Sequence, residues 1–306
     1  MLEKRDERHQ KWLISDEERE YETFVAEGLG EWADIDQTLL ELEAMRLDFS
    51  VSFDYDLTAI GSAADKAVSE LKALFGSQGT IFNNAINSQL TCLLANLYHG
   101  YQRNNRRLIR ISQHNGKVVP PRYNPSGVAT KSLKKIKDAL LANDYVFFFP
   151  GHYARGKTSR QSKSPKIIAD PSLIDFLEKE CGWSLATISY HNEAETIRMR
   201  SKRDANKKRT FISYDDTPDV KRQRQALQRY NAFMAEQDIQ IPTPVGIMRD
   251  VFMTRRTFTD ESWQLGGRLF GGGFQQLSKE DRKRITINSE PVVELDIKSC
   301  HATMAF

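Results

Sequence analysis

Asp296 stands near the end of the apolar stretch VVELDI (292–297), where its carboxylate could hold a metal ion. A strand that ends in a carboxylate suits Mg²⁺, which uses one or two carboxylates and leaves its other positions for phosphate oxygens and water. In phosphoryl transfer such an ion orients the attack and offsets the developing charge. A carboxylate there also caps helices or forms turns, so Asp296 taken alone leaves both roles open.

The surroundings of Asp296 resemble motif A of the family A nucleic-acid polymerases and the approach to it. In chain order the matching residues are Gly267-Arg268-Leu269, Gln275 or Gln276, Arg282 or Arg284, Asp296 and Ser299. The resemblance implies that Asp296 is the first palm ligand for Mg²⁺ and that Arg268 contacts the template and primer. Ser299 takes the place of the small polar residue of the motif. His301 stands where the family often has a glutamate that discriminates against ribose, so the choice between deoxynucleotides and ribonucleotides stays open.

The sequence given ends ten residues after Asp296, at Phe306. A palm of this family also needs a fingers helix with Arg and Lys and a second catalytic carboxylate. Two-metal chemistry requires ligands that hold the two ions about 3.5–4 Å apart, which one aspartate does not supply. The alternatives are therefore a nucleotidyltransferase of which this chain is an N-terminal fragment, and a binding protein without polymerase activity.

A wider stretch, from about Tyr123 to Phe306, is similar to a loosely defined family of phage and mobile-element proteins. The residues that carry this similarity are Tyr214-Asp215-Asp216-Thr217, Tyr230-Asn231, Gly266 to Gly272, and Glu294 to His301. The similarity implies a basic wing, a following helix and a glycine-rich approach to the carboxyl-terminal motif. It implies an architecture and no particular reaction.

Other candidate sites have simpler interpretations. The stretch GGRLFGGG lacks the Lys-Ser/Thr pair of a phosphate-binding loop and the spacing of a dinucleotide fingerprint. We therefore expect its glycines to allow a turn with close backbone approach. Asp215-Asp216 could bind a metal, but a turn after a strand is the simpler role. His152 in the wing could bind phosphate, but a surface histidine is the simpler role, and His191 and His301 lack the ligand spacing of a zinc site.

Charge is distributed unevenly along the chain. Residues 1–60 contain 17 Asp and Glu against 6 Lys and Arg, whereas residues 101–170 contain 15 Lys and Arg against 3 Asp. A basic block of this size suits a polyanion, because phosphate contacts supply most of non-specific nucleic-acid affinity. A merely solvated basic surface is the alternative. The acidic start could be a solubilising arm, a screen for the basic surface or a site for a protein partner.

The basic block has the element order of a winged helix. Residues 62–75 and 81–103 have helical periodicity, RLIRIS (107–112) has strand alternation, and Thr130 could cap a basic helix. Strands at 146–150 and 166–170 would flank a basic loop. In this interpretation the helix enters the major groove and the loop touches flanking phosphates or the minor groove. The expected contacts are Lys131, Lys134, Lys135 and Lys137 on the helix, with Arg155, Lys157, Arg160 and Lys163 on the wing.

The overall prediction is an α+β, mostly helical protein: a winged-helix-like DNA-binding domain followed by a partial palm-like segment. We expect an acidic helical arm at 1–60, the winged-helix-like domain at 61–190, a hairpin and basic helix at 191–245, and the motif-A-like segment at 246–306. The hairpin of residues 195–216 has a basic turn, residues 220–241 form a helix, and Pro242 and Pro244 mark a linker.

Cys92, Cys181 and Cys300 lie far apart, which is typical of reduced thiols in a cytosolic protein, and no run of apolar residues is long enough for a membrane span. We therefore expect a protein of the host cytoplasm or nucleoid. It would bind duplex DNA, or RNA, during replication of a phage or mobile element. A DNA-binding regulator with a protein partner is a further alternative.

Overall fold

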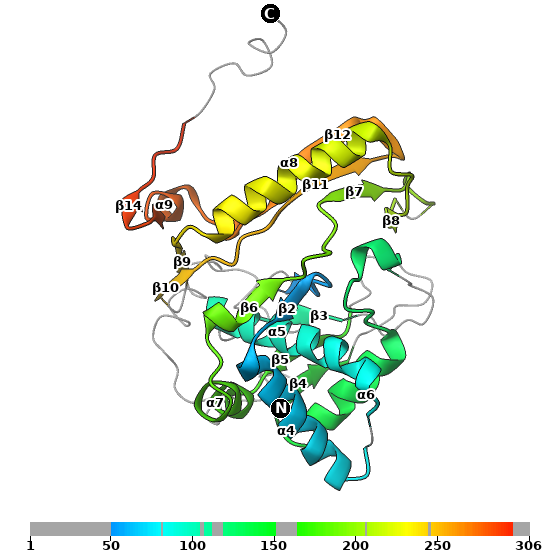
Figure 1. Ribbon diagram of the computed structural model, residues 1–306, viewed down its shortest axis with the longest axis vertical. Helices are drawn as coiled ribbons and strands as arrows, with labels where there is room; N and C mark the ends of the chain where they lie inside the picture. Colours follow the sequence, from blue (N-terminus) through cyan, green and yellow to red (C-terminus); the bar gives the residue numbers. More distant parts are fainter. Residues whose placement is uncertain are drawn as a thin grey trace, which may run out of the picture.

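The computed structural model describes residues 50–80, 82–104, 107–111, 119–150, 164–205, 207–243 and 246–295. These residues form an α+β structure, which confirms that part of the predicted fold class. Figure 1 shows a body of helices around a sheet, built by the earlier part of the chain, and an outer layer of strands with one long helix lying across that body. None of the helices within these ranges is long and apolar enough to cross a membrane.

A mixed four-stranded sheet, in the order β1-β3-β5-β4, forms the centre of the body. β1 runs parallel to β3, and the other two pairs are antiparallel. The strands are β1 (Val51–Ser52), β3 (Ile109–Arg110), β4 (Val146–Phe149) and β5 (Lys166–Ala169). The predicted pairing of residues 146–150 with 166–170 is confirmed. The pair extends into a larger sheet, however, because β3 also bonds β5.

Three helices supply about half of the main hydrophobic core: α4 (Ser62–Ser77), α5 (Asn87–Arg103) and α6 (Thr130–Leu141). The sequence predicted α4 and α6 within a few residues. It placed the start of α5 at residue 81, but the α-helix begins at Asn87 after a 3₁₀ turn, Asn84–Ile86. Asparagine side chains compete for backbone hydrogen bonds and so favour such turns over a regular helix. Thr130 is the first residue of α6, and its expected capping bond is not formed.

α7 (Pro171–Asp175) and a two-stranded ribbon complete the body. Asp170 caps α7 by accepting a hydrogen bond from the Ser172 backbone N–H at 2.8 Å. The ribbon pairs β2 (Leu57–Ala59) with β6 (Ile188–Tyr190) in antiparallel register. β2 packs on α5 of the body, and β6 is followed along the chain by β7 of the outer layer. The ribbon therefore lies at the connection between the two parts.

The outer layer is a four-stranded sheet, in the order β12-β11-β7-β8, with α8 (Pro218–Ala235) lying along it (Figure 1). The strands are β7 (Ile197–Arg200), β8 (Phe211–Ile212), β11 (Thr254–Thr259) and β12 (Ser262–Gly271). Asn231 fastens α8 to the sheet, because its side chain bonds both the N–H and the carbonyl oxygen of Thr254, at 2.8 and 2.9 Å. The predicted hairpin at 195–216 and the helix that follows it are confirmed, although the helix ends at Ala235.

Gly271, at the end of β12, has the role predicted for the glycines of this stretch, because it allows the backbones of two strands to approach closely. Gly271 has φ +124°, and a Cβ placed on it would lie 1.8 Å from the carbonyl oxygen of Met253. No side chain fits there, so β11 and β12 can approach each other only with glycine at this end of the hairpin.

A smaller sheet, β10-β9-β13-β14, corrects two expectations. Its strands are β9 (Ile239–Thr243), β10 (Gly246–Arg249), β13 (Thr286–Ile287) and β14 (Glu290–Pro291), with the short helix α9 (Lys279–Arg282) nearby. Pro242, expected in a linker, lies inside β9 opposite Ile247. The stretch predicted as a buried strand is irregular over 292–295: Val292 is half-buried against the cluster that contains Ile241 and Phe252, whereas Val293 is 82% and Leu295 88% exposed. β14 pairs over only two residues, so the strand pairing ends before Val293 and Leu295.

Candidate functional site

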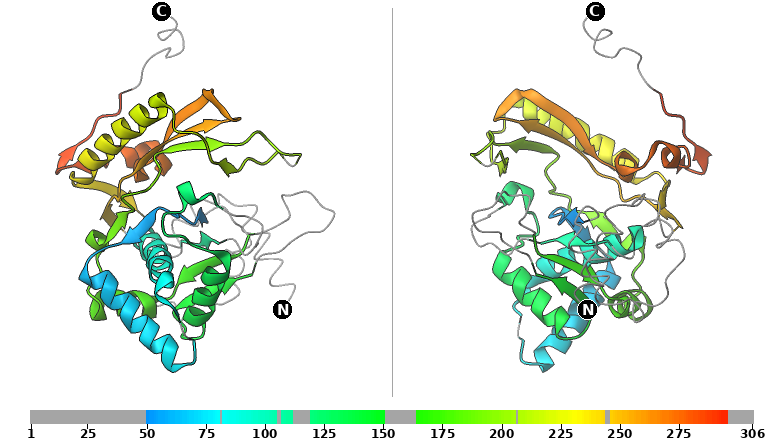
Figure 2. Two further views of the ribbon diagram at one scale, coloured as in Figure 1. Left: turned by 45° about the vertical axis from the view of Figure 1, so that its right-hand side comes forward. Right: turned by 180° about the vertical axis from the view of Figure 1, so that it is seen from behind.

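The hairpin between β7 and β8 concentrates exposed positive charge. Arg200, Lys202, Arg203, Lys207 and Lys208 are exposed, and Asp204 is the one acidic residue between positions 200 and 208. Arg209, next along the chain, is neutralised by Asp260 at 2.6 Å. Figure 2 shows the tip of this hairpin extending away from the body of the protein. A projecting cationic tip of this kind can enter a groove or contact phosphates without moving the core.

The turn of this hairpin is built by Asp204. Its carboxylate accepts the Lys208 backbone N–H at 2.8 Å, and its carbonyl oxygen accepts the Lys207 N–H at 2.8 Å. Lys207 adopts φ +60°, which closes the turn. The Asp204 carboxylate is therefore bound to the backbone of the turn, while the lysines on either side are exposed to solvent. At the base, Arg200 lies over the ring of Phe211, 5.2 Å from its centre.

α6 presents a second cationic surface. Lys131, Lys134 and Lys135 are exposed and line a hollow of about 360 Å³, together with Gln78 and Thr80, which follow α4, and with the acidic Asp138. In the described part of the chain, no ion pair joins Lys131 or Lys134 to a carboxylate, whereas Lys135 lies over the Phe82 ring at 4.8 Å. The structure thus brings three of the four predicted helix lysines to one face.

Lys137 is a correction to that prediction. It is 5% exposed, its Nζ lies 2.5 Å from an Asp138 carboxylate oxygen, and it sits 4.0 Å from the centre of the Phe148 ring. The helical period that places residues 131, 134 and 135 outward turns position 137 toward the sheet. A lysine held between a ring and a carboxylate is not available to phosphate in this conformation.

Several predicted site residues lie outside the described residues: Arg155, Lys157, Arg160 and Lys163 of the expected wing, and Asp296, Ser299 and His301 of the motif-A-like end. The winged-helix, palm and Mg²⁺ interpretations therefore stay predictions. Arg268 is described: it lies on β12 opposite Thr257 and is exposed.

A buried ionic cluster, which sequence reasoning missed, joins the body to the outer layer. Asp56, with no exposed surface, accepts from Arg255 Nε at 2.9 Å and also bonds Arg198. Asp54 accepts two bonds from Arg255 Nη2, at 3.0 and 3.1 Å. The partners are 142 to 201 positions apart in sequence, so no local pattern could have revealed them. The alternation of Asp54 and Asp56 just before β2 was the only signal.

Burial and charge act in opposite directions within this cluster. Burial alone would raise the pKa of Asp54, but the nearby Arg255 and Arg198 guanidinium groups outweigh it and lower that pKa. For Asp56 burial dominates and raises the pKa above its usual value, against the same two arginines. Because each carboxylate is already neutralised by arginine, Asp54 and Asp56 do not fit a metal site. In the described ranges no group of three or more acidic, histidine or cysteine side chains could hold a metal ion.

A second network accounts for the conspicuous Tyr214-Asp215-Asp216-Thr217 segment. Glu195, 6% exposed, pairs with Arg122 and Arg224, each at 2.9 Å, and both arginines also bond Asp216. The Arg122 guanidinium lies 4.2 Å from the centre of the Tyr214 ring. Thr217 caps α8 by accepting the Val220 N–H at 3.3 Å. The segment therefore connects β8 to α8, and its ion pairs and cap fix the start of α8.

No family model, no curated protein and no solved structure matches the chain.

Proposed function

We propose that this protein binds nucleic acid through its phosphates, with the β7–β8 hairpin as the principal contact. The observation that carries the proposal is the cluster of five exposed cationic side chains on a projecting hairpin, where the one intervening acid is used to form the turn. Phosphate contacts of this type position a protein on nucleic acid without reading its sequence. The resemblance to mobile-element proteins is consistent with a role in replication or its control.

α6 supplies the second contact in this proposal. A hollow bordered by Lys131, Lys134 and Lys135 can receive a phosphate group, and it is separate from the hairpin in the fold. Lysine acts there as a compact point charge, so we expect little base specificity. The alternative of a nucleotidyltransferase depends on Asp296 and has no support from the described residues.

Salt dependence tests the proposal most simply. The chain is titrated with fluorescent duplex DNA, single-stranded DNA and RNA at several salt concentrations, and anisotropy gives the binding constant. For B-DNA, each phosphate contact contributes about 0.9 to the slope of log K against log salt concentration. Changing Lys202, Lys207 and Lys208 to Ala should lower the magnitude of the slope by about 2–3, and changing Lys131, Lys134 and Lys135 to Ala should lower it further.

A control variant removes the same charge elsewhere. Lys66, Lys179 and Lys283 are exposed lysines that each pair with a neighbouring carboxylate. Replacing these three by Ala should leave the slope nearly unchanged. If the control variant and the hairpin variant lose slope equally, the binding reflects net charge alone and the hairpin is not the contact. If the wild-type chain binds none of the three nucleic acids at low salt, the proposal is wrong.

A further inference from the structure

The chain before Ser50 contains a strongly acidic segment, residues 20–45. This acidic segment has 8 Asp and Glu and no Lys or Arg, whereas the hairpin from Arg200 to Lys208 has 5 Lys and Arg and 1 Asp. The formal net charges of the two stretches are therefore −8 and +4. Nucleic acid would meet the hairpin with the same repeated negative charge, so the acidic segment can compete with it for the same cations.

The cations of the hairpin are open to such a partner. Lys202, Lys207 and Lys208 are exposed, and no carboxylate of a described residue forms an ion pair with them. The Asp204 carboxylate between them is bound to the backbone N–H of Lys208 at 2.8 Å. Single ion pairs at a surface are weak, so a stable contact requires several acids that meet several cations at once. The acidic segment and the hairpin each supply several charges.

The described chain begins close to the layer that carries the hairpin. Ser50 lies six positions before Asp56, which bonds Arg198 of β7, and Arg198 lies four positions before Lys202. A fully extended chain covers at most about 3.6 Å per residue, so Ser50 lies within roughly 45 Å of Lys202. Figures 1 and 2 show β1 on the side of the body that faces β7 and β8.

The connecting chain is long enough for the acidic segment to reach the hairpin. Trp32, near the middle of the segment, lies 18 positions before Ser50, and an extended chain of that length spans about 60 Å. Because both partners belong to one chain, a connection of this kind gives an effective concentration of about 1 mM. With a weak Kd of about 0.3 mM, the hairpin would be occupied about three quarters of the time, and its affinity for DNA would decrease about fourfold.

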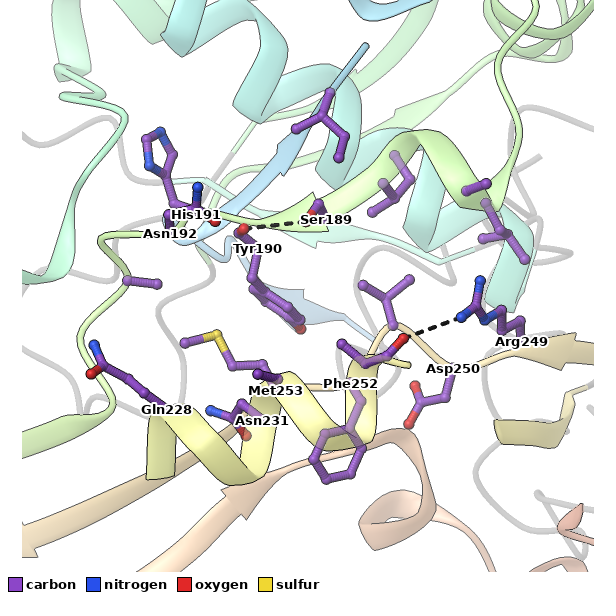
Figure 3. Close-up of a pocket in the computed structure, with 18 of the residues that line it drawn as sticks. Ser189, Tyr190, His191, Asn192, Gln228, Asn231, Arg249, Asp250, Phe252 and Met253 are labelled. Atoms are coloured by element: carbon purple, nitrogen blue, oxygen red, sulfur yellow. Dashed lines mark hydrogen bonds between the residues drawn. The ribbon is translucent and has the colours of Figure 1, made fainter. Parts of the chain in front are cut away.

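Two hollows in the described part of the chain fit the acidic segment less well than the hairpin does. The hollow beside α6 has an acid, Asp138, among its lining residues. A cavity of about 510 Å³ lies between the β2–β6 ribbon, α8 and residues 249–253 (Figure 3). Arg249 is the one Lys or Arg among the described residues that line it. Its guanidinium already bonds the Ala235 carbonyl oxygen at 3.2 Å and pairs with Asp238 at 3.9 Å. Charge therefore directs the segment to the hairpin.

We propose that the acidic segment docks on the β7–β8 hairpin in the absence of nucleic acid and is displaced when nucleic acid binds. This inference rests on the function proposed above, because it assigns a competitor to the same surface. The segment then selects among polyanions. One with few phosphates competes poorly with eight linked carboxylates, whereas a long nucleic acid displaces them.

Lysine acetylation without any DNA tests this contact directly. Two variants of the intact chain each lose five negative charges. The segment variant carries Glu27→Gln, Glu31→Gln, Asp34→Asn, Asp36→Asn and Glu41→Gln. The control variant changes exposed acids of the described structure, namely Asp65→Asn, Glu193→Gln, Asp215→Asn, Glu236→Gln and Glu290→Gln.

At low salt, Lys202, Lys207 and Lys208 should be acetylated about two to four times faster in the segment variant than in the control variant. Lys131 and Lys134 should be acetylated at the same rate in both. Equal rates at the hairpin lysines would overturn the proposal. An increase at the α6 lysines alone would also overturn it, because it would place the segment on α6.

DNA affinity gives a second test and separates this inference from the proposed function. The segment variant should bind duplex DNA about threefold more tightly than the control variant at low salt. This difference should disappear when Lys202, Lys207 and Lys208 are changed to Ala in both. If the Ala changes leave DNA binding unaltered, the proposed function fails. If they weaken DNA binding while the segment and control variants bind DNA equally, this inference fails and the proposed function stands.

Discussion

Arg255→Met tests whether the buried ionic cluster holds the outer layer on the body. Arg255 is 8% exposed and lies at the start of β11, and its guanidinium bonds both Asp54 and Asp56. Methionine keeps much of the side-chain volume but removes the charge. Asp56 would remain fully buried, with Arg198 as the one cation that pairs with it among the described residues. Removing one partner of a buried pair costs about 3–5 kcal/mol, because it leaves an uncompensated charge. We expect a loss in that range at pH 7.

Chemical denaturation followed by tryptophan fluorescence measures this loss. The loss should shrink at low pH. In the variant the pKa of Asp56 lies still higher than in the wild type, and a protonated carboxyl no longer needs a cation. The matched control is Arg222→Met, since Arg222 pairs with Asp219 on the surface of α8, where both side chains are more than 70% exposed. Exposed pairs contribute at most about 1 kcal/mol.

A loss below about 1 kcal/mol for Arg255→Met would refute the reasoning, as would a loss that stays constant between pH 7 and pH 4. Either result would mean that water or another group compensates the two carboxylates, and that apolar packing alone holds the two parts of the protein together.

Two further predictions concern the backbone and a histidine. Gly271→Ala should destabilise the protein by more than the 1–3 kcal/mol that an unfavourable φ costs, because the new Cβ also meets the Met253 carbonyl; Gly127→Ala, at φ +61° with nothing within 4 Å, is the control for φ alone. Chemical denaturation compares the two variants, and equal losses would contradict the close approach. Burial, with Arg103, lowers the pKa of His99 to about 3. Below about pH 6.5 the unfolded chain therefore binds more protons than the folded one. As the pH decreases through this range, the free energy of unfolding should decrease by up to about 1.4 kcal/mol per pH unit. His99→Gln should remove that part of the slope in denaturation curves between pH 7 and 4.5; an unchanged slope would contradict the assignment.

Local structure was largely predictable from the sequence. The helical period of residues 62–75 and 130–141, the hairpin with a basic turn and the strand pair around residue 150 all follow from the spacing of apolar side chains. The same period places Lys131 and Lys134 on the exposed face. The prediction for Lys137 was wrong because it followed the charge of the residue, whereas the same period turns position 137 toward the sheet, where the side chain is buried.

Long-range features were not predictable. Asp56 meets Arg198 and Arg255 only after the chain has folded, and residues that distant carry no shared pattern in one sequence. The segment at 292–295 shows the opposite failure. Its apolar pattern is typical of a buried strand, but burial also requires a partner surface, and the described residues supply one for Val292 while Val293 and Leu295 stay exposed. An apolar pattern shows what a segment could bury, and the rest of the fold decides whether it does.

Protection of lysines from acetylation by bound DNA tests the central claim most directly. The protein is treated with a limiting acetylating reagent, with and without duplex DNA at low salt, and mass spectrometry quantifies each site. We predict strong protection of Lys202, Lys207 and Lys208, weaker protection of Lys131 and Lys134, and none of Lys179 and Lys283. Equal acetylation of the hairpin lysines in the presence and absence of bound DNA would contradict the proposed interface.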